Sequence, residues 1–330
     1  MLKEKLGVLL QYKTLTRDDA RDILLGIAEE RYNKSQVVAF LSVYMMRPVT
    51  VDELLGFTDA LLETCHRIDL SEFDAMDLVG TGGDCKNTFN ISTVSTFVVA
   101  GAGVHVSKHG NYGVSSGCGS SNVLEALGYK FTNDEATLRR QMEQAGICFL
   151  HAPLFSPAMK AVGPIRRELG VKTFFNILGP LVNPSFPKCQ MSGVFSLEVG
   201  RLYQYLFQRR GIRYCVLHSL DGYDEVSLTG GVKVVRNQGE ELLFPEDLKL
   251  RTVRPEEIAG GATIEGAKDI FVDLLEGRGT PAQVDVVLAN SALALQCARP
   301  ELSWDDALAA ARESLESKKA LGVLKKLLSI

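Results

Sequence analysis

The sequence predicts an α/β fold in two parts, a small all-helical domain and then a larger α/β domain whose mainly parallel central sheet is covered by helices. Residues up to about Asp74 carry only helical patterns, and from Ala75 onward short β-branched runs alternate with helices. Two of those runs end in glycine-rich turns, and α/β sheets bind ligands beyond the carboxyl ends of their strands.

Length and composition indicate two domains and a globular enzyme or binding protein. The chain has 330 residues, more than the roughly 250 to 300 at which a single hydrophobic core stops growing. We expect a helical N-terminal domain over residues 1–74, joined by helices from about 155–185 at a homodimer interface, and a catalytic domain over residues 75–330. The net charge of -4 argues against the broad basic face that binds nucleic acid, so no nucleic-acid partner is expected.

The cysteines and the start of the chain indicate a cytoplasmic protein. Seven cysteines are scattered without a C-x-x-C pair, so neither a disulfide framework nor a zinc site is indicated and a reducing compartment is expected. The opening MLKEKLGVLLQYK lacks a small-residue cleavage site, and no apolar run approaches the length of a membrane span. We therefore expect neither export nor a membrane partner.

Capping patterns predict three helices in the first domain. Thr16 stands three residues before an aspartate, and Ser35 precedes a long apolar stretch. Thr50 and Glu53 form a capping box, and Pro48 predicts the end of the middle helix. These helices carry no repeated polar constellation, which favours a scaffold or a subunit interface over a catalytic role.

Strand-like and helix-like segments alternate in the second domain. In chain order they are MDLVG at 76–80, ISTVSTFVVAGAG at 91–103, VHVS at 104–107, VLEALG at 123–128, RLYQYLFQRR at 201–210 and YCVLHS at 214–219. Such alternation predicts a parallel sheet covered by helices. Residues 230–250, with their hairpin-like glycines, predict a further β excursion late in the chain.

The first glycine-rich turn, GTGGD at residues 80–84, suits a phosphate group. Glycine lets backbone N–H groups point together at phosphate oxygens, and a helix that follows adds the positive end of its dipole. The turn is not a dinucleotide fingerprint, because Cys85 stands where a third glycine is required. NIST at residues 90–93 could bind phosphate or metal at the start of the next helix; a tight turn with an ordinary N-cap is the alternative.

The second turn begins at Lys108, directly after the strand-like VHVS, and runs to Ser121. Lys108 offers a point charge to phosphate, and the serines and glycines offer a concavity rich in donors. A flexible surface loop is the alternative, and His109 taken alone fits a structural hydrogen bond as well as catalysis. Two such turns in tandem predict a ligand with two separated phosphate groups.

Adjacent carboxylates follow the last strand-like segment, in the sequence HSLDGYDE at residues 218–225. Asp224 and Glu225 repel one another unless a cation lies between them, and hard oxygen ligands suit Mg²⁺ that bridges protein and pyrophosphate. Departure of a diphosphate also requires charge neutralisation. A solvated acidic turn is the alternative.

The order of these motifs resembles the anthranilate phosphoribosyltransferase family of tryptophan biosynthesis over nearly the whole chain. The motifs are GTGGD, NIST, KHGN, SSGCGSSNVLEALG, RRELGVKTFFNILGPLVNP and the Asp-Glu pair. The resemblance implies a homodimer with the fold of the pyrimidine nucleoside phosphorylases. It also implies transfer of the phosphoribosyl group of 5-phosphoribosyl 1-diphosphate to the amine of anthranilate, giving N-(5-phosphoribosyl)anthranilate and diphosphate.

The resemblance also implies the site residues, with no side chain assigned as a certain catalytic group. Its phosphoribosyl diphosphate site corresponds here to Gly80, Gly83, Asp84, Thr88, Asn90, Ile91, Ser92, Thr93, Lys108, His109, Gly110, Asn111, Tyr112, Gly113, Val114, Ser115, Ser116 and Ser120. Its ligands for two Mg²⁺ ions per subunit correspond to Ser92, Asp224 and Glu225. Its anthranilate contacts correspond to Gly80, Asn111 and Arg166, the arginine pairing with the substrate carboxylate.

Two departures from the family pattern concern substrate binding. The family motif KHGNR ends here in Tyr112, which replaces a fixed cation with a neutral phenol and implies greater reliance on Lys108 and magnesium. Ser156 stands where the family commonly has a histidine ahead of Pro-Ala-Met, so the acceptor site loses an imidazole.

Two other functions remain open from the sequence. A pyrimidine nucleoside phosphorylase would share the architecture, but such enzymes are longer and do not typically carry GTGGD with KHGN in this form. A non-catalytic nucleic-acid-binding relative would be basic and would have lost the acidic pair, whereas this chain is acidic and keeps Asp224 and Glu225.

Overall fold

The computed structural model describes residues 2–113 and 117–330, and the chain divides into two compact units. The helical unit comprises the chain up to Ile68 together with Ala152–Pro184, and the α/β unit comprises Asp69–His151 together with Ser185–Ile330. The helical unit is therefore assembled from two stretches that lie far apart in the sequence. Val114, Ser115 and Ser116, predicted to contact the diphosphate, lie outside the described residues.

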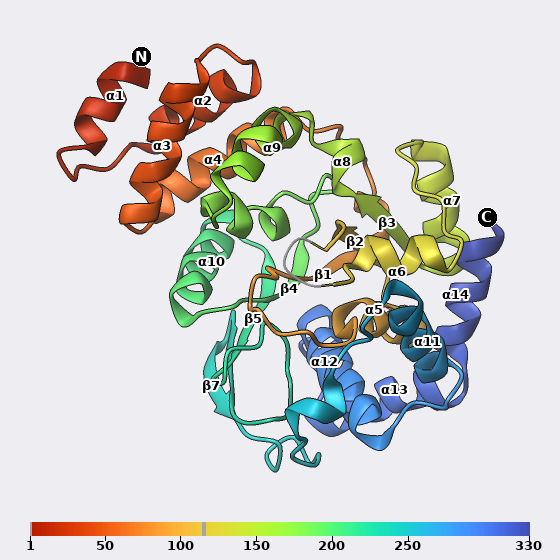
Figure 1. Ribbon diagram of the computed structural model, residues 1–330. Helices are drawn as coiled ribbons and strands as arrows, with labels where there is room; N and C mark the ends of the chain where they lie inside the picture. The colour runs from red at the N-terminus through yellow and green to blue at the C-terminus, as the bar shows by residue number, and fades with distance from the viewer. Residues whose placement is uncertain (1, 114–116) are drawn as a thin grey trace. The chain divides into compact units, whose positions relative to one another are not determined.

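The helical unit contains helices from both of its stretches (Figure 1). They are α1 (Leu2–Leu9), α2 (Arg17–Ala28), α3 (Lys34–Met46), α4 (Val51–Glu63), α8 (Ala152–Phe155) and α9 (Pro157–Leu169), followed by the short 3-10 helices η2 (Phe174–Ile177) and η3 (Gly179–Leu181). The predicted cap at Thr16 and the Thr50–Glu53 capping box are both present. Helix α3 begins one residue before Ser35, because the side chain of Asn33 accepts a hydrogen bond from the Gln36 N–H and caps it there.

Aromatic side chains join the two stretches of the helical unit. The ring of Phe174, from the second stretch, stacks on Phe57 at 4.5 Å between centroids and meets Tyr44 edge-on at 5.1 Å. Phe40 completes this cluster against the same rings, and all four side chains are buried. Aromatic burial of this kind, and not local helix propensity, holds short helices together in water.

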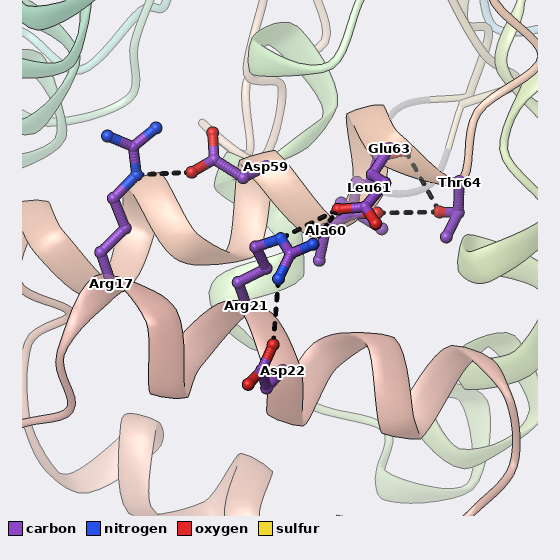
Figure 2. A network of polar contacts seen from close by, with 8 residues as sticks. All are labelled: Arg17, Arg21, Asp22, Asp59, Ala60, Leu61, Glu63 and Thr64. Atoms are coloured by element: carbon purple, nitrogen blue, oxygen red, sulfur yellow. Dashed lines mark hydrogen bonds and ion pairs between the residues drawn. The ribbon is translucent and has the colours of Figure 1, made fainter.

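Helices α2 and α4 approach each other closely at Gly56. A Cβ atom on Gly56 would lie 2.2 Å from the backbone oxygen of Arg17, so glycine is required there by contact between the two backbones. Along the outside of this contact Arg17 pairs with Asp59 at 2.5 Å and Arg21 with Glu63 at 2.6 Å (Figure 2). Because ion pairs exposed to water stabilise little, packing at Gly56 dominates the contact.

The α/β unit is built on a sheet with the predicted, mainly parallel arrangement. The described strands are β1 (Met76–Gly80), β2 (Val106–Gly110), β3 (Ile147–His151), β4 (Cys189–Gly193), β5 (Arg213–Ser219), β6 (Val232–Arg236) and β7 (Gly239–Leu243), in the order β3-β2-β1-β4-β5-β6-β7. Strands β1 to β5 are parallel, whereas β6 and β7 are antiparallel. This hairpin occupies the predicted β excursion.

Helices cover this sheet and supply most of its core (Figure 1). They are α5 (Ile91–Gly101), α6 (Ser120–Ala126), α7 (Glu135–Ala145), α10 (Leu197–Arg210), α11 (Ile264–Leu275), α12 (Pro281–Ala298), α13 (Trp304–Glu316) and α14 (Lys319–Ser329), with the 3-10 helices η1 (Ser71–Phe73) and η4 (Pro255–Ile258). Helix α5 packs on β1, β2 and β3, and α12 packs on α5, β4 and β5. Among the described residues, no helix is long and apolar enough to cross a membrane.

Strand β2 corrects one predicted boundary. The second turn was expected to begin at Lys108, but β2 continues through Lys108 and His109 to Gly110, and both side chains are buried. The reason is β3, a strand that the sequence patterns did not predict, which pairs with β2 in register from Val106 to Gly110. The start of the predicted loop is therefore rigid strand.

We predict that Gly56→Ala destabilises the helical unit by about 1 to 3 kcal/mol, because the new methyl group meets a backbone oxygen that cannot rotate away. Urea unfolding followed by circular dichroism measures this change. Arg21→Ala, which removes an exposed ion pair on the same two helices, is the matched control and should leave the unfolding midpoint nearly unchanged. Equal midpoints for Gly56→Ala and the unmodified protein would show that the two helices part easily.

Candidate functional site

The strand order places a topological switch point between β1 and β4. The chain continues from β1 to β2 and β3 on one side, and β4 and β5 follow on the other side. Gly80 ends β1 and pairs in register with Gly193, which ends β4. Open α/β sheets bind ligands in the crevice outside the strand ends at such a point.

The acidic turn after β5 lies directly against these two strand ends. A Cβ atom on Gly193 would stand 1.5 Å from the backbone oxygen of Asp224, and one on Gly80 would stand 2.5 Å from the Oδ2 atom of the same aspartate. Only glycine at both strand ends leaves room for Asp224. The sequence patterns did not indicate Gly193, although a glycine that follows the short CQMS segment is a signal of the same kind as Gly80.

Backbone N–H groups hold the two carboxylates in place. The N–H of Gly82, in the first turn, donates to Asp224 Oδ2 at 2.6 Å. The N–H of Ser92, the second residue of helix α5, donates to Glu225 Oε1 at 2.8 Å. This carboxylate therefore lies at the positive end of the helix dipole. Thr88 Oγ1 donates to the other oxygen of Glu225 at 3.4 Å.

The pair carries negative charge that its protein surroundings do not fully compensate. Burial raises the pKa of Asp224, and the nearby carboxyl of Asp84 raises it further. Burial likewise raises the pKa of Glu225, with Asp224 as the next cause, and the hydrogen bond from Ser92 acts against both. Asp224 is only 8% exposed, which excludes the alternative of a solvated acidic turn.

Lys108 supplies positive charge close to this pair. Its side chain is buried and its Nζ donates to the backbone oxygen of Leu78 in β1. Burial lowers the pKa of Lys108 to about 8, and the carboxylates of Asp77, Glu225 and Asp224 act in the opposite direction. A lysine held in this way is predominantly charged at pH 7 and can serve an anionic ligand.

The chemistry of these side chains fits a divalent cation that is shared with a phosphorylated ligand. Within the described part of the chain, no three His, Cys, Asp or Glu side chains form a complete metal cage. Two carboxylates and the hydroxyl of Ser92 are few ligands, but Mg²⁺ commonly takes one or two carboxylates from a protein and completes its shell with water and phosphate oxygens. A cation there would also offset the buried charge of Asp224 and Glu225.

The first turn has the irregular backbone that its glycines predict. Gly82 and Gly83 have φ angles of +62° and +77°, in the region that favours glycine. The residues that follow, Asn87 and Thr88, contact Gly260, which the sequence patterns did not indicate. Gly260 donates its N–H to the backbone oxygen of Asn87 at 2.6 Å, and a Cβ there would stand 2.6 Å from the oxygen of Thr88.

Asn122, which was not among the predicted site residues, bonds to both ends of the second turn. Its Oδ1 accepts hydrogen bonds from the N–H groups of Gly113 and Gly119, both at 3.0 Å. Asn90 links the two turns, because its Nδ2 donates to the backbone oxygen of Cys118 at 3.0 Å. Ser120 follows at the start of α6, and its Oγ donates to the backbone oxygen of Asn111 at 3.4 Å.

The phenol of Tyr112, which stands where the family motif has an arginine, contacts its own unit. Its side chain is 39% exposed, and its hydroxyl donates to Glu125 Oε1 at 3.4 Å, on α6. Its ring meets the edge of the His151 ring at 4.8 Å between centroids. The phenol is thus engaged with α6 and the end of β3.

The remaining predicted residues fall into three settings. The side chains of Ile91, Thr93 and His109 are buried, whereas Asn111 is exposed. Arg166 belongs to α9 of the helical unit, where its Nη2 donates to Asn176 Oδ1 at 3.4 Å. Burial lowers the pKa of this guanidinium, which stays fully charged at pH 7.

Family models match both parts of the chain. Residues 72–321 match the α/β domain of a glycosyl transferase family, and residues 3–65 match the helical bundle domain of the same family. An anthranilate phosphoribosyltransferase of Cytophaga hutchinsonii is 54% identical, with 98% of this chain and 99% of that protein covered. One of Bacteroides thetaiotaomicron is 50% identical, with 100% and 99% covered.

Solved structures agree with these relatives. Anthranilate phosphoribosyltransferase from Thermus thermophilus superposes with a TM-score of 0.92 at 31% identity, covering 98% of each chain. The enzyme from Saccharomyces cerevisiae in complex with PRPP and Mg has a TM-score of 0.91 at 27% identity, covering 99% of this chain and 97% of that one. The fold and the family that the sequence motifs predicted are thereby confirmed, and this chain belongs to the anthranilate phosphoribosyltransferase family.

Proposed function

We propose that this protein transfers the phosphoribosyl group of 5-phosphoribosyl 1-diphosphate to the amine of anthranilate, giving N-(5-phosphoribosyl)anthranilate and diphosphate in tryptophan biosynthesis. The observation that carries this proposal is the pair formed by the buried Asp224 and the partly buried Glu225 at the switch point, between the first glycine turn and the start of α5. Two such carboxylates can hold a cation that also binds a strongly anionic leaving group.

The diphosphate substrate binds, in this proposal, over the two glycine turns. Lys108 and the positive end of α5 supply fixed positive charge, and Ser92, Asp224 and Glu225 hold Mg²⁺. Support comes from the yeast relative, whose structure contains PRPP and Mg, and from the chemistry of the carboxylate pair described above. Two ions per subunit is the proposed number.

The chemical step then relies on positioning and charge. As the bond between ribose C1 and the diphosphate oxygen breaks, negative charge grows on the leaving group, where Lys108 and the α5 dipole stabilise it. Bound Mg²⁺ adds charge neutralisation at the same group. The aromatic amine is neutral at pH 7, so it attacks C1 without a strong base and loses its proton to water afterwards.

The acceptor site is assigned to Gly80, Asn111 and Arg166, with Arg166 pairing with the carboxylate of anthranilate. A yeast relative solved in complex with 4-fluoroanthranilate, which has a TM-score of 0.88, supports an aromatic acid as the acceptor. Arg166 also lies over the ring of Phe175 at 5.4 Å, a contact that orients its guanidinium.

The proposal includes a homodimer formed through the helical unit in the cytoplasm. Support comes from large apolar side chains at the ends of α1 and α3. Leu10, Tyr12 and Met46 are 71%, 88% and 86% exposed, and these two helices contact each other. Exposed apolar groups of this size commonly mark protein interfaces.

Mixing the protein with 5-phosphoribosyl 1-diphosphate, Mg²⁺ and anthranilate should cause anthranilate fluorescence to disappear, and omission of any one component should stop the loss. Phosphorolysis of thymidine and uridine, measured in parallel, should be absent. Phosphorolysis without loss of anthranilate would instead assign the protein to nucleoside chemistry.

We expect the double variant Asp224→Asn with Glu225→Gln to lose turnover by about 100-fold or more, because the cation loses both carboxylates. Its thermal stability without ligands should not fall, since burial already disfavours the charged forms of both groups. Asp221→Asn, which changes an exposed carboxylate in the same turn, is the control and should retain activity. Full activity in the double variant would remove the metal assignment.

Arg166→Ala should raise the KM for anthranilate by about 10- to 100-fold, the usual effect of losing a hydrogen bond to a charged group. The KM for 5-phosphoribosyl 1-diphosphate should stay near that of the unmodified protein in steady-state kinetics. Arg17→Ala, another arginine of the helical unit, serves as control. A rise confined to the diphosphate substrate would contradict the placement of the acceptor.

A further inference from the structure

Asn290 is a buried polar residue in the middle of the largely apolar helix α12. Its side chain is 1% exposed, and its amide makes three hydrogen bonds. Nδ2 donates to the backbone oxygen of Val226 at 2.9 Å and to that of Val286, one turn earlier in the helix, at 2.8 Å. Oδ1 accepts from the N–H of Val226 at 3.1 Å.

The amide of Asn290 thus takes the place of a neighbouring strand for Val226. Val226 is itself 1% exposed and lies outside the strands, so within residues 2–113 and 117–330 no strand pairs with its N–H and C=O groups. Buried backbone groups require such partners. Because Val226 directly follows Glu225, the contact holds the chain at the end of the acidic pair.

Two further contacts anchor the rest of this turn. Ser219, the last residue of β5, donates from its Oγ to the backbone oxygen of Glu225 at 2.6 Å. The backbone of Asp224 is confined by Gly193 at the end of β4, as described above. The carboxylate pair is therefore held by β4, by β5 and by α12, and α12 reaches it through Asn290.

We propose that Asn290 is a positioning residue for the divalent-cation site, which it serves by fixing the backbone that carries Glu225. The proposal rests on the function proposed above, in which Asp224 and Glu225 hold Mg²⁺. Two carboxylates of like charge move apart unless the backbone restrains them, and a cation binds tightly only to ligands held at the correct separation. Residues that orient metal ligands typically change metal affinity when they are replaced.

A control residue lies at the start of β5, the strand whose other end leads to the acidic pair. Asn237, in the turn between β6 and β7, accepts from the N–H of Tyr214 at 2.8 Å and donates to the backbone oxygen of Ile212 at 2.9 Å. Like Asn290, Asn237 uses its amide both to accept a hydrogen bond from a backbone N–H and to donate one to a backbone oxygen. Asn237 lies at the start of β5, however, whereas Asn290 acts on the chain beyond its end.

The test measures Mn²⁺ binding by electron paramagnetic resonance, in the presence of inorganic diphosphate, for the unmodified protein, Asn290→Leu and Asn237→Leu. Far-UV circular dichroism and the melting temperature monitor the fold of each variant. We expect Asn290→Leu to weaken Mn²⁺ binding by about 10- to 100-fold. Asn237→Leu should bind Mn²⁺ as the unmodified protein does. Excess Mg²⁺ should restore much of the turnover that Asn290→Leu loses at low Mg²⁺.

If Asn290→Leu does not fold, Asn290→Ser is measured in its place, because the smaller side chain leaves room for a water molecule that bonds to Val226. Unchanged Mn²⁺ affinity in a folded Asn290 variant would overturn the inference, as would an equal loss of affinity in Asn237→Leu. Failure of the unmodified protein to bind Mn²⁺ would overturn the metal assignment in the proposed function, and the inference with it.

Discussion

The site depends on the approach of one turn to two strand ends at a distance that only glycine allows. Without a side chain at Gly193, the backbone of Asp224 rests directly on the end of β4, and Gly80 leaves room for the carboxylate over β1. This contact brings the acidic pair, which follows the end of β5, to the switch point between β1 and β4. The first glycine turn, α5 and Lys108 then surround one small volume.

The electrostatics of that volume explain why the arrangement suits an anionic ligand together with a cation. The buried carboxylate of Asp224 and the partly buried carboxylate of Glu225 lie near that of Asp84, and the N–H groups of Gly82 and Ser92 compensate them only in part. Such a site is unfavourable by itself and becomes favourable when a divalent ion enters. Lys108 is held at β1 by its own hydrogen bond, and its positive charge can attract phosphate oxygens. The neutral Tyr112, engaged with Glu125, adds none.

Much of the fold follows from local chemistry in the sequence. The capping box at Thr50, the alternation from Met76 onward and the hairpin glycines around Gly239 each depend on contacts between near neighbours, and the structure contains all three. The glycine turns and the acidic pair are also contiguous in the sequence, so they could be recognised without the structure. Strands β3 and β4 were missed because both are short and buried. Strand β3 is a mostly apolar run that periodicity cannot distinguish from a helix, and β4 buries the polar side chains of Gln190 and Ser192.

Sequence alone therefore determined the family, the two-part fold class and the residue types at the site, because short motifs record them. Only the tertiary structure decided that Lys108 lies inside a strand, that Gly193 must be glycine and that Asn290 serves the acidic turn. These relations join residues that lie far apart in the chain: Gly193 and Asp224 are separated by 31 positions, and Asn290 and Val226 by 64. Contacts of this range arise from the packing of strands and helices, which leaves no periodic mark in the chain.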